Sequence, residues 1–257
     1  MKISKIVNYL ESKFPLNTAH DMDYGKIGLQ FGSLNADVKK VMIALDGSSS
    51  VVDEALKENV DLLLLHHPFM FSPLLNLNYD SAFGKKVVKV IKNDLNVFAM
   101  HTNFDVGVNG MNDILAKKLL LSNIEMAESE VGPKNLLRIG EVTPCSLNDF
   151  ALQVSELLEE KHIRTVGNRN KIIKKVGIVG GAGASELHTA YKKGCDVLVT
   201  GEVHHHQALD ALDLDIALIE VSHSVERHFA NVIKEELERE FPDVEFIVSE
   251  NNINPFE

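Results

Sequence analysis

The chain has 257 residues, of which 45% are hydrophobic and 25% are charged, and it carries a formal net charge of −11 with 11 histidines and 2 cysteines. This length corresponds to one large domain or two ordinary ones, and the composition excludes the disordered, collagen-like and membrane-spanning classes. The acidic balance argues against broad nucleic-acid binding, because such binding relies on Lys and Arg side chains that neutralise phosphates. Two cysteines without a CxxC pair or a disulfide framework favour the reducing cytoplasm.

Apolar periodicity predicts that helices and strands alternate along both halves of the chain. In the first half, the predicted elements are a helix over 1–11, a strand over 41–45, a helix over 51–59, a strand over 61–65, a helix over 81–92, a strand over 97–100 and a helix over 111–120. A charged stretch over 125–135, which contains Gly132-Pro133, is the best linker candidate. In the second half, the predicted elements are a strand over 138–142, a helix over 147–160, a strand over 176–179, a helix over 185–193, a strand over 196–199, a helix over 206–212, a strand over 216–219, a helix over 227–240 and a strand over 244–248.

An internal repeat relates the two halves at a spacing of 135 residues. The strand, loop, helix and strand over 41–65 recur without a gap over 176–199. A unit of this kind is a βαβ module with a parallel sheet, although chance similarity between βαβ units is an alternative to duplication. The predicted fold is α/β, with two interlocked lobes at 1–127 and 128–257, pseudo-repeated βαβ units, mainly parallel strands, and a C-terminal helix able to return to the first lobe.

Seven of the eleven histidines lie in four loops that follow predicted strands. In open α/β sheets, ligands bind beyond the carboxyl ends of the strands, so these loops are expected to form a site. The four loops are His66-His67-Pro68, His101–Asp105, Gly201–His206 and His223–Glu226.

Imidazole and carboxylate groups together favour divalent cations such as zinc, manganese, iron or cobalt, and the four loops lack the thiolates of a structural zinc site. Adjacent histidines, such as His66 and His67, can bind two different metal ions where the chain turns. His223 and Glu226 are at i and i+3, so their side chains face the same way on a helical turn. Asp105, four residues beyond His101, is the natural carboxylate to bridge the two ions. The predicted ligands of two divalent ions are His66, His67, Asp105, His223 and Glu226. Three neutral imidazoles and two carboxylates bring −2 against the +4 of two dications, and the remainder suits a hydroxide and an anionic substrate group.

Simpler interpretations exist for several of these residues. Asp105 and Glu226 could be helix N-terminal charges that interact with the helix dipole. At least one residue of the run His204-His205-His206 is expected to be merely solvated. The Gly180–Gly183 loop could bind a phosphate through backbone N–H groups, but a tight turn is the favoured interpretation, and Ser48–Ser50 is interpreted as helix capping.

Several motifs together resemble a family of hexameric dinuclear-metal proteins that are labelled GTP cyclohydrolase I type 2 homologues. The motifs occur in the same order as in that family, from the first helix to the tail, and Ser222 stands where the family usually has glycine before its late histidine. They are Gly28-Leu-Gln-Phe-Gly32, His66-His67-Pro68, His101-Thr-Asn-Phe-Asp105, Asn109-Gly-Met-Asn-Asp113, Gly180-Gly-Ala-Gly183 and Asn254-Pro-Phe256.

The resemblance implies two interlocked α/β lobes and a toroidal homohexamer, built as a trimer of dimers, with metal sites that face the inner cavity. By motif, the family's metal ligands fall on the five ligand positions predicted above, and His101 and His206 fall at positions that line the site. The chain corresponds to the short form of the family, which lacks a large inserted domain between the halves.

Three functions are compatible with these features. The first is a metal-dependent hydrolase of a nucleotide or another phosphorylated small molecule, GTP ring opening included, in which the cations activate water and His101 or His206 moves protons. The second is a non-catalytic metal-binding ring that acts as a scaffold, a metal chaperone or a regulatory partner. The third, DNA binding by threading through the ring, is disfavoured by the acidic charge.

Overall fold

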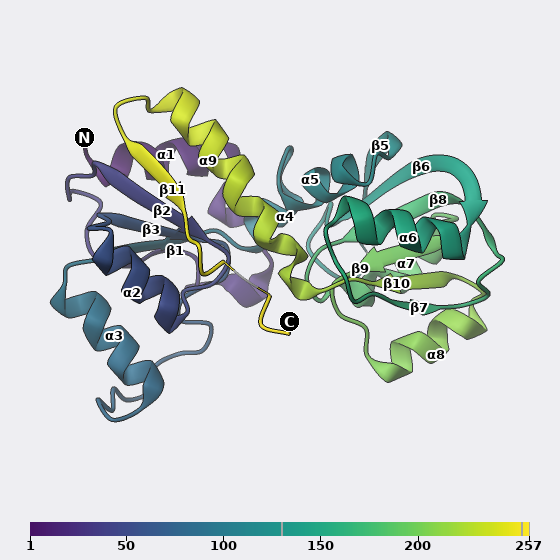
Figure 1. Cartoon of the computed structure of the whole chain (residues 1–257), viewed down its shortest axis with the longest axis horizontal. Coiled ribbons are helices and arrows are strands. Elements are labelled where there is room, and N and C mark those ends of the chain that lie inside the picture. Colours follow the sequence, from purple (N-terminus) through teal and green to yellow (C-terminus); the bar gives the residue numbers. More distant parts are fainter. Residues whose placement is uncertain (130, 253, 257) are drawn as a thin grey trace. The chain divides into compact units, whose positions relative to one another are not determined.

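The computed structural model describes residues 1–129, 131–252 and 254–256, and the chain folds into two compact units (Figure 1). Unit 1 comprises Met1–Phe104 and Arg227–Ile253, and unit 2 comprises Asp105–Glu226 and Asn254–Glu257. Residues 105–127, which the predicted lobe at 1–127 included, lie in unit 2, whereas the C-terminal helix, for which a return to the first lobe was predicted, lies in unit 1. The chain passes from one unit to the other next to Asp105 and next to Glu226, which are two of the predicted ligands.

Unit 1 is a five-stranded sheet with the order β1-β4-β3-β2-β11 and helices on both faces. Strands β4, β3, β2 and β11 run parallel to one another, whereas β1 is antiparallel to β4. Helices α1 and α9 cover one face, and α2 and α3 cover the other (Figure 1). The elements are α1 (Ile3–Lys13), β1 (Gly28–Phe31), β2 (Lys40–Ala44), α2 (Ser49–Lys57), β3 (Leu62–Leu65), α3 (Ala82–Lys92), β4 (Asn96–Ala99), α9 (His228–Glu240) and β11 (Glu245–Val248), with 3-10 turns η1 (Leu16–Thr18) and η2 (Asp21–Asp23).

The core of unit 1 follows from its apolar patterning. Strand β3 is four leucines, all wholly buried, as expected for a central strand covered on both faces. Ile3, Ile6, Val7 and Leu10 recur at helical spacing and form the buried face of α1. Helix α2 begins where the sequence predicts capping, because the Ser48 side chain accepts the Val51 N–H at 3.2 Å.

Unit 2 is a six-stranded mixed sheet with the order β5-β6-β8-β9-β10-β7. Helices α7 and α8 contribute to an apolar cluster with strands β6, β8, β9 and β10. The elements are α5 (Met111–Lys118), β5 (Ser122–Ala127), β6 (Leu137–Ser146), α6 (Leu147–Leu157), β7 (Arg164–Val166), β8 (Ile172–Val179), η3 (Gly183–Glu186), α7 (Leu187–Lys192), β9 (Val197–Thr200), α8 (His205–Asp213), β10 (Ala217–Glu220) and η4 (His223–Arg227), while α4 (Thr102–Val106) spans the junction with unit 1.

The 135-residue repeat has the same backbone pairing in both units. Val41 pairs with Leu62 in parallel strands of unit 1, and Val176 pairs with Val197 in unit 2. In each copy, the aspartate before the second strand accepts N–H groups from two consecutive lysines at the first strand. These bonds run from Lys39 and Lys40 to Asp61 at 2.8 and 2.9 Å, and from Lys174 and Lys175 to Asp196 at 2.8 Å each.

Two sequence predictions need correction. The prediction of mainly parallel strands is too broad, because β5–β6, β6–β8 and β7–β10 in unit 2 are antiparallel and both sheets are mixed. The predicted linker over 125–135 begins inside β5, which pairs with β6 as an edge strand, and residue 130 of that linker lies outside the described residues. Within the described part of the chain, no helix has the length and apolar character needed to cross a membrane.

Candidate metal centre

Three histidines emerge at the carboxyl edge of the unit 1 sheet. The ladder between β2 and β3 continues past Leu65, because His66 N donates to Ala44 O at 3.2 Å and His67 N donates to Leu45 O at 2.9 Å. His101 follows β4, the next parallel strand, and its N–H donates to the Asn103 side chain at 2.9 Å. The sheet topology therefore carries residues that are 34 positions apart in sequence to the same edge.

The three imidazole rings converge. The centroid of the His66 ring lies 5.1 Å from that of His67 and 5.5 Å from that of His101. One ring nitrogen of each histidine lies within 4.8 Å of a ring nitrogen of the other two. His66 is wholly buried, with its ring 6.1 Å from the ring of Phe104 and 5.4 Å from that of Phe229. Three convergent imidazoles with an apolar flank are a donor set that fits a divalent cation such as zinc or manganese.

Carboxylates contact the Nδ1 atoms of two of these rings. Asp46 Oδ1 lies 2.7 Å from His67 Nδ1, and both carboxylate oxygens of Asp23 lie 2.9 Å from His101 Nδ1. Asp23 is wholly buried in the η2 turn. Carboxylates in this position orient metal-binding histidines and fix the tautomer of the ring.

The environment of Asp23 favours its ionised form. Burial by itself would raise the pKa of Asp23, but hydrogen bonds and attraction from His101, together with hydrogen bonds from the Thr102 hydroxyl and N–H, outweigh burial and lower that pKa. The sequence pattern does not single out Asp23, which lies in an irregular stretch without periodicity. Asp46 is not among the predicted site residues either, although its place directly after a predicted strand is a signal that could have found it.

Unit 2 carries the late histidine and glutamate as an adjacent pair. His223 Nε2 lies 3.3 Å from Glu226 Oε2, as the i and i+3 spacing predicts for one face of a helical turn. The other ring nitrogen, Nδ1, lies 2.6 Å from Glu202 Oε1. Ser222 accepts the Ser224 N–H through its hydroxyl at 3.1 Å, a contact that glycine at this position could not provide.

The glycine loop of unit 2 makes room for this pair. A Cβ atom at Gly180 or Gly181 would lie 2.8 Å from Glu226 Oε1, and a Cβ at Gly201 would lie 2.9 Å from the Cα of His223. Gly181 also has a φ of +55°, which favours glycine. The tight-turn interpretation of this loop thus gains a physical reason, since side chains there would collide with the Glu226 carboxylate.

Asp105 is held in unit 2 through its backbone. Asn112, which is 1% exposed, donates to Asp105 O at 3.3 Å and accepts the Gly180 N–H at 2.8 Å, so it ties α4 to the glycine loop. The buried Arg138 guanidinium donates to Val106 O at 3.0 Å and so holds the next residue of the chain. The Asn109–Asp113 motif therefore has a supporting role, and the Asp105 carboxylate itself is buried.

His206 belongs to a different unit from the histidine triad. It belongs to α8 in unit 2, is exposed to solvent, and stacks on His204 with the ring centroids 5.8 Å apart and the planes 10° from parallel. Its predicted role in proton transfer stays a prediction.

Similarity to known proteins agrees with this architecture. A family model described as Duf34/NIF3 (NGG1p interacting factor 3) matches residues 1–255. A Clostridium perfringens protein named GTP cyclohydrolase 1 type 2 homolog is 31% identical over 271 residues, which cover 100% of this chain and 99% of that protein. The crystal structure of a Bacillus cereus protein related to NIF3 is 26% identical, with a TM-score of 0.93 over 100% of this chain and 99% of that one.

A second solved structure, of a Staphylococcus aureus hypothetical protein, is 29% identical with a TM-score of 0.92, and it covers 100% of this chain and 99% of that one. Fold and site together define an α/β protein with two mixed sheets and a histidine–carboxylate cluster suited to metal binding. The chain belongs to the Duf34/NIF3 family.

Proposed function

We propose that this protein is a metal-dependent hydrolase in which two divalent cations are held by His66, His67, Asp105, His223 and Glu226. The observation that carries this proposal is the convergence of the His66, His67 and His101 imidazoles in unit 1. Carboxylates contact the Nδ1 atoms of the His67 and His101 rings. Two carboxylate ligands of unit 2 are covalent neighbours of unit 1, because Asp105 follows Phe104 and Glu226 precedes Arg227. Zinc, manganese, iron or cobalt suit this mixture of nitrogen and oxygen donors.

The side chains around the cluster have separate tasks. The bound cations would polarise a substrate bond and activate water. With Nδ1 held by Asp23, His101 accepts and returns a proton at Nε2 during the reaction. Asp46 fixes the orientation of the His67 ring in the same way. The rings of Phe104 and Phe229 shield His66 from water on their side.

The proposed substrate is a nucleotide or another phosphorylated small molecule. The five proposed ligands carry a total charge of −2, because the three imidazoles are neutral and the two carboxylates are ionised. Two dications add +4, so the loaded site has a net charge of +2, which favours an anionic substrate group. Opening of the GTP purine ring is the first reaction to measure, because the name of the Clostridium perfringens relative refers to GTP cyclohydrolase.

The test compares metal content and turnover in matched variants. We expect Asp105→Ala to lose bound metal and turnover of GTP or a phosphoester, whereas Asp210→Ala, which removes an exposed carboxylate from α8, keeps both. We expect His101→Ala to lower turnover by about 10²–10⁴-fold, the usual contribution of a positioned acid or base. If the wild type holds metal but is as inert as Asp105→Ala across a broad panel of nucleotides and phosphoesters, the hydrolase proposal is wrong. A partner protein that is recovered in stoichiometric amount and lost on chelation would then support a metal-binding scaffold.

A further inference from the structure

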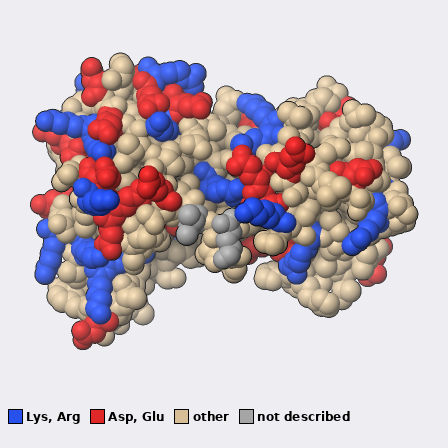
Figure 2. Space-filling view, in the orientation of Figure 1, with Lys and Arg blue, Asp and Glu red and all other residues tan. Residues whose placement is uncertain are grey.

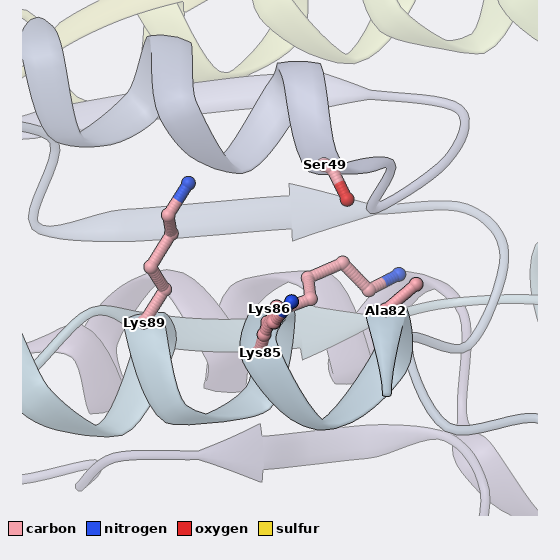
Figure 3. Close-up of a pocket in the computed structure, with 5 residues that line it drawn as sticks. All are labelled: Ser49, Ala82, Lys85, Lys86 and Lys89. Atoms are coloured by element: carbon pink, nitrogen blue, oxygen red, sulfur yellow. The ribbon is translucent and has the colours of Figure 1, made fainter. Parts of the chain in front are cut away.

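A surface pocket in unit 1 is lined by basic side chains. Its volume is about 260 Å³, and it lies between the first turn of α2 and residues 82–89 of α3 (Figure 3). Ser49 points from α2 toward α3, and Lys89 extends from α3 toward α2 (Figure 3). We call it the lysine pocket; its lining residues are Ser49, Ala82, Lys85, Lys86 and Lys89.

The lysine pocket is electropositive. Lys89 forms an ion pair with Asp53, but in the described part of the chain neither Lys85 nor Lys86 has a carboxylate within ion-pair distance. The half-buried Lys86 ammonium donates to Gly47 O at 2.6 Å and lies 4.3 Å from the centre of the Phe69 ring. Burial lowers the pKa of Lys86 and outweighs the attraction of the nearby Asp46 carboxylate, which alone would raise that pKa. Figure 2 shows Lys and Arg side chains gathered over α3.

The start of α2 adds to this field. Ser48 caps the helix by accepting the Val51 N–H, so the N–H groups of Ser49 and Ser50 begin the helix before its first internal bond. A helix start carries a partial positive charge, and the Ser49 hydroxyl lines the pocket beside the lysines. Ammonium, hydroxyl and backbone N–H donors together match the acceptor oxygens of a phosphate group.

Pocket size narrows the choice of ligand. Sites that enclose a whole drug-sized ligand have volumes of about 300–1,000 Å³. A pocket of about 260 Å³ is therefore suited to one end of a larger molecule, such as its phosphate group.

The lysine pocket and the histidine triad share one loop. Gly47 accepts the bond from Lys86, and its neighbour Asp46 holds His67 Nδ1 at 2.7 Å. Both α2 and α3 begin after parallel strands, so the pocket opens at the same edge of the sheet as His66 and His67. A small molecule bound at this edge can contact both features.

We propose that the lysine pocket binds the phosphate group of a phosphorylated small molecule whose other end reaches His66, His67 and His101. The phosphate contact stands on the pocket alone, whereas the reach to the histidines rests on the proposed function. Lys85 and Lys89 approach the phosphate from α3, and Ser49 approaches it from α2.

Titration calorimetry with inorganic phosphate tests the pocket. We expect the double variant Lys85→Gln/Lys89→Gln to raise the Kd for phosphate at least ~10-fold, as loss of two charge-assisted contacts requires. The matched control, Lys57→Gln/Lys92→Gln, removes two charges from the opposite ends of the same helices and should leave the Kd unchanged. Three of the four lysines lie on α3, and Lys57 lies on α2. All four are exposed. Thermal unfolding checks that each variant folds. Equal Kd values in the two double variants, or no phosphate binding by the wild type, would overturn the proposal.

A further pair of titrations separates this inference from the proposed function. We expect His67→Ala to lose metal and to bind guanosine 5′-monophosphate more weakly, while its Kd for inorganic phosphate stays that of the wild type. Loss of phosphate binding in His67→Ala would place the anion at the histidines and would contradict the lysine pocket. If no protein holds metal but the lysine dependence of phosphate binding persists, the proposed function fails and the phosphate site stands.

Discussion

At the scale of single residues, the candidate site depends on carboxylates that contact the Nδ1 atoms of its histidines. His67 and His101 each have a carboxylate at Nδ1, and His223 has one as well, so all three rings are oriented by hydrogen bonds. Such partners fix the tautomer and raise the basicity of the nitrogen that faces a metal. The candidate site therefore consists of the histidines together with the carboxylates that orient their rings.

Asp23 should therefore control the proton transfer proposed for His101 without binding metal. We expect Asp23→Asn to lower turnover by about 10–100-fold with its metal content unchanged, because the His101 ring loses the carboxylate that orients it. Asp21→Asn, an exposed position in the same η2 turn, is the matched control and should turn over substrate as the wild type does. Turnover and metal content of both variants measure the difference. Equal turnover in the two variants would show that Asp23 has no part in orienting His101.

At the scale of elements, one carboxylate of α2 fastens the C-terminal segment to the unit 1 sheet. Glu54 accepts the Glu250 N–H at 2.8 Å and the Asn251 side-chain amide at 2.9 Å, and it also accepts the Ser249 hydroxyl. Burial by itself would raise the pKa of Glu54, but these hydrogen bonds outweigh it and lower the pKa below the ordinary 4.5. The segment after β11 is thus held by an ionised side chain.

Unfolding should report this contact through its pH dependence. A carboxyl group whose pKa is lowered on folding stabilises the folded state above its unfolded pKa, and this stabilisation disappears as the pH falls through the lowered pKa. We expect Glu54→Gln to reduce the free energy of unfolding by about 1–2 kcal/mol at pH 7, with a difference from the wild type that shrinks below pH 4.5. Urea unfolding of both proteins, with Glu11→Gln on α1 as control, measures this. A pH-independent difference would contradict the assignment.

At the scale of the whole molecule, the chain combines two units that share a βαβ design. The pairing register and the aspartate bonds recur 135 residues apart, and the glycine loop of unit 2 stands where unit 1 has the loop of Asp46 and Gly47. Each unit places histidines after parallel strands, which is the edge where such sheets bind ligands.

Assembly is a prediction that the family resemblance motivates. We expect the protein to form a hexamer, a trimer of dimers, with the mass of six chains of 28.5 kDa. Light scattering coupled to size-exclusion chromatography measures this mass directly, with and without a chelator, to show whether metal binding stabilises the ring. A monomer or a dimer at micromolar concentration would contradict it.

Much of the architecture could be predicted from local pattern. The helices and strands with strong apolar periodicity, such as α1, β3 and α3, were located to within a few residues, because their spacing records which face is buried. Strands β1 and β7 escaped prediction, since they are short edge strands defined by antiparallel pairing with distant partners. The end of strand β5 was included in the predicted linker because most of the strand's side chains are exposed and show no clear apolar face.

The sequence by itself determined that histidines and carboxylates follow the strands of two βαβ units, because strand ends are readable from apolar runs. Tertiary structure alone decided that the rings of His66, His67 and His101 converge, that Asp23 contacts His101, and that strand β11 joins the unit 1 sheet. The physical reason is distance along the chain: Asp23 and His101 are 78 residues apart. Only the folding of the sheet, and not any local spacing, brings such residues into contact.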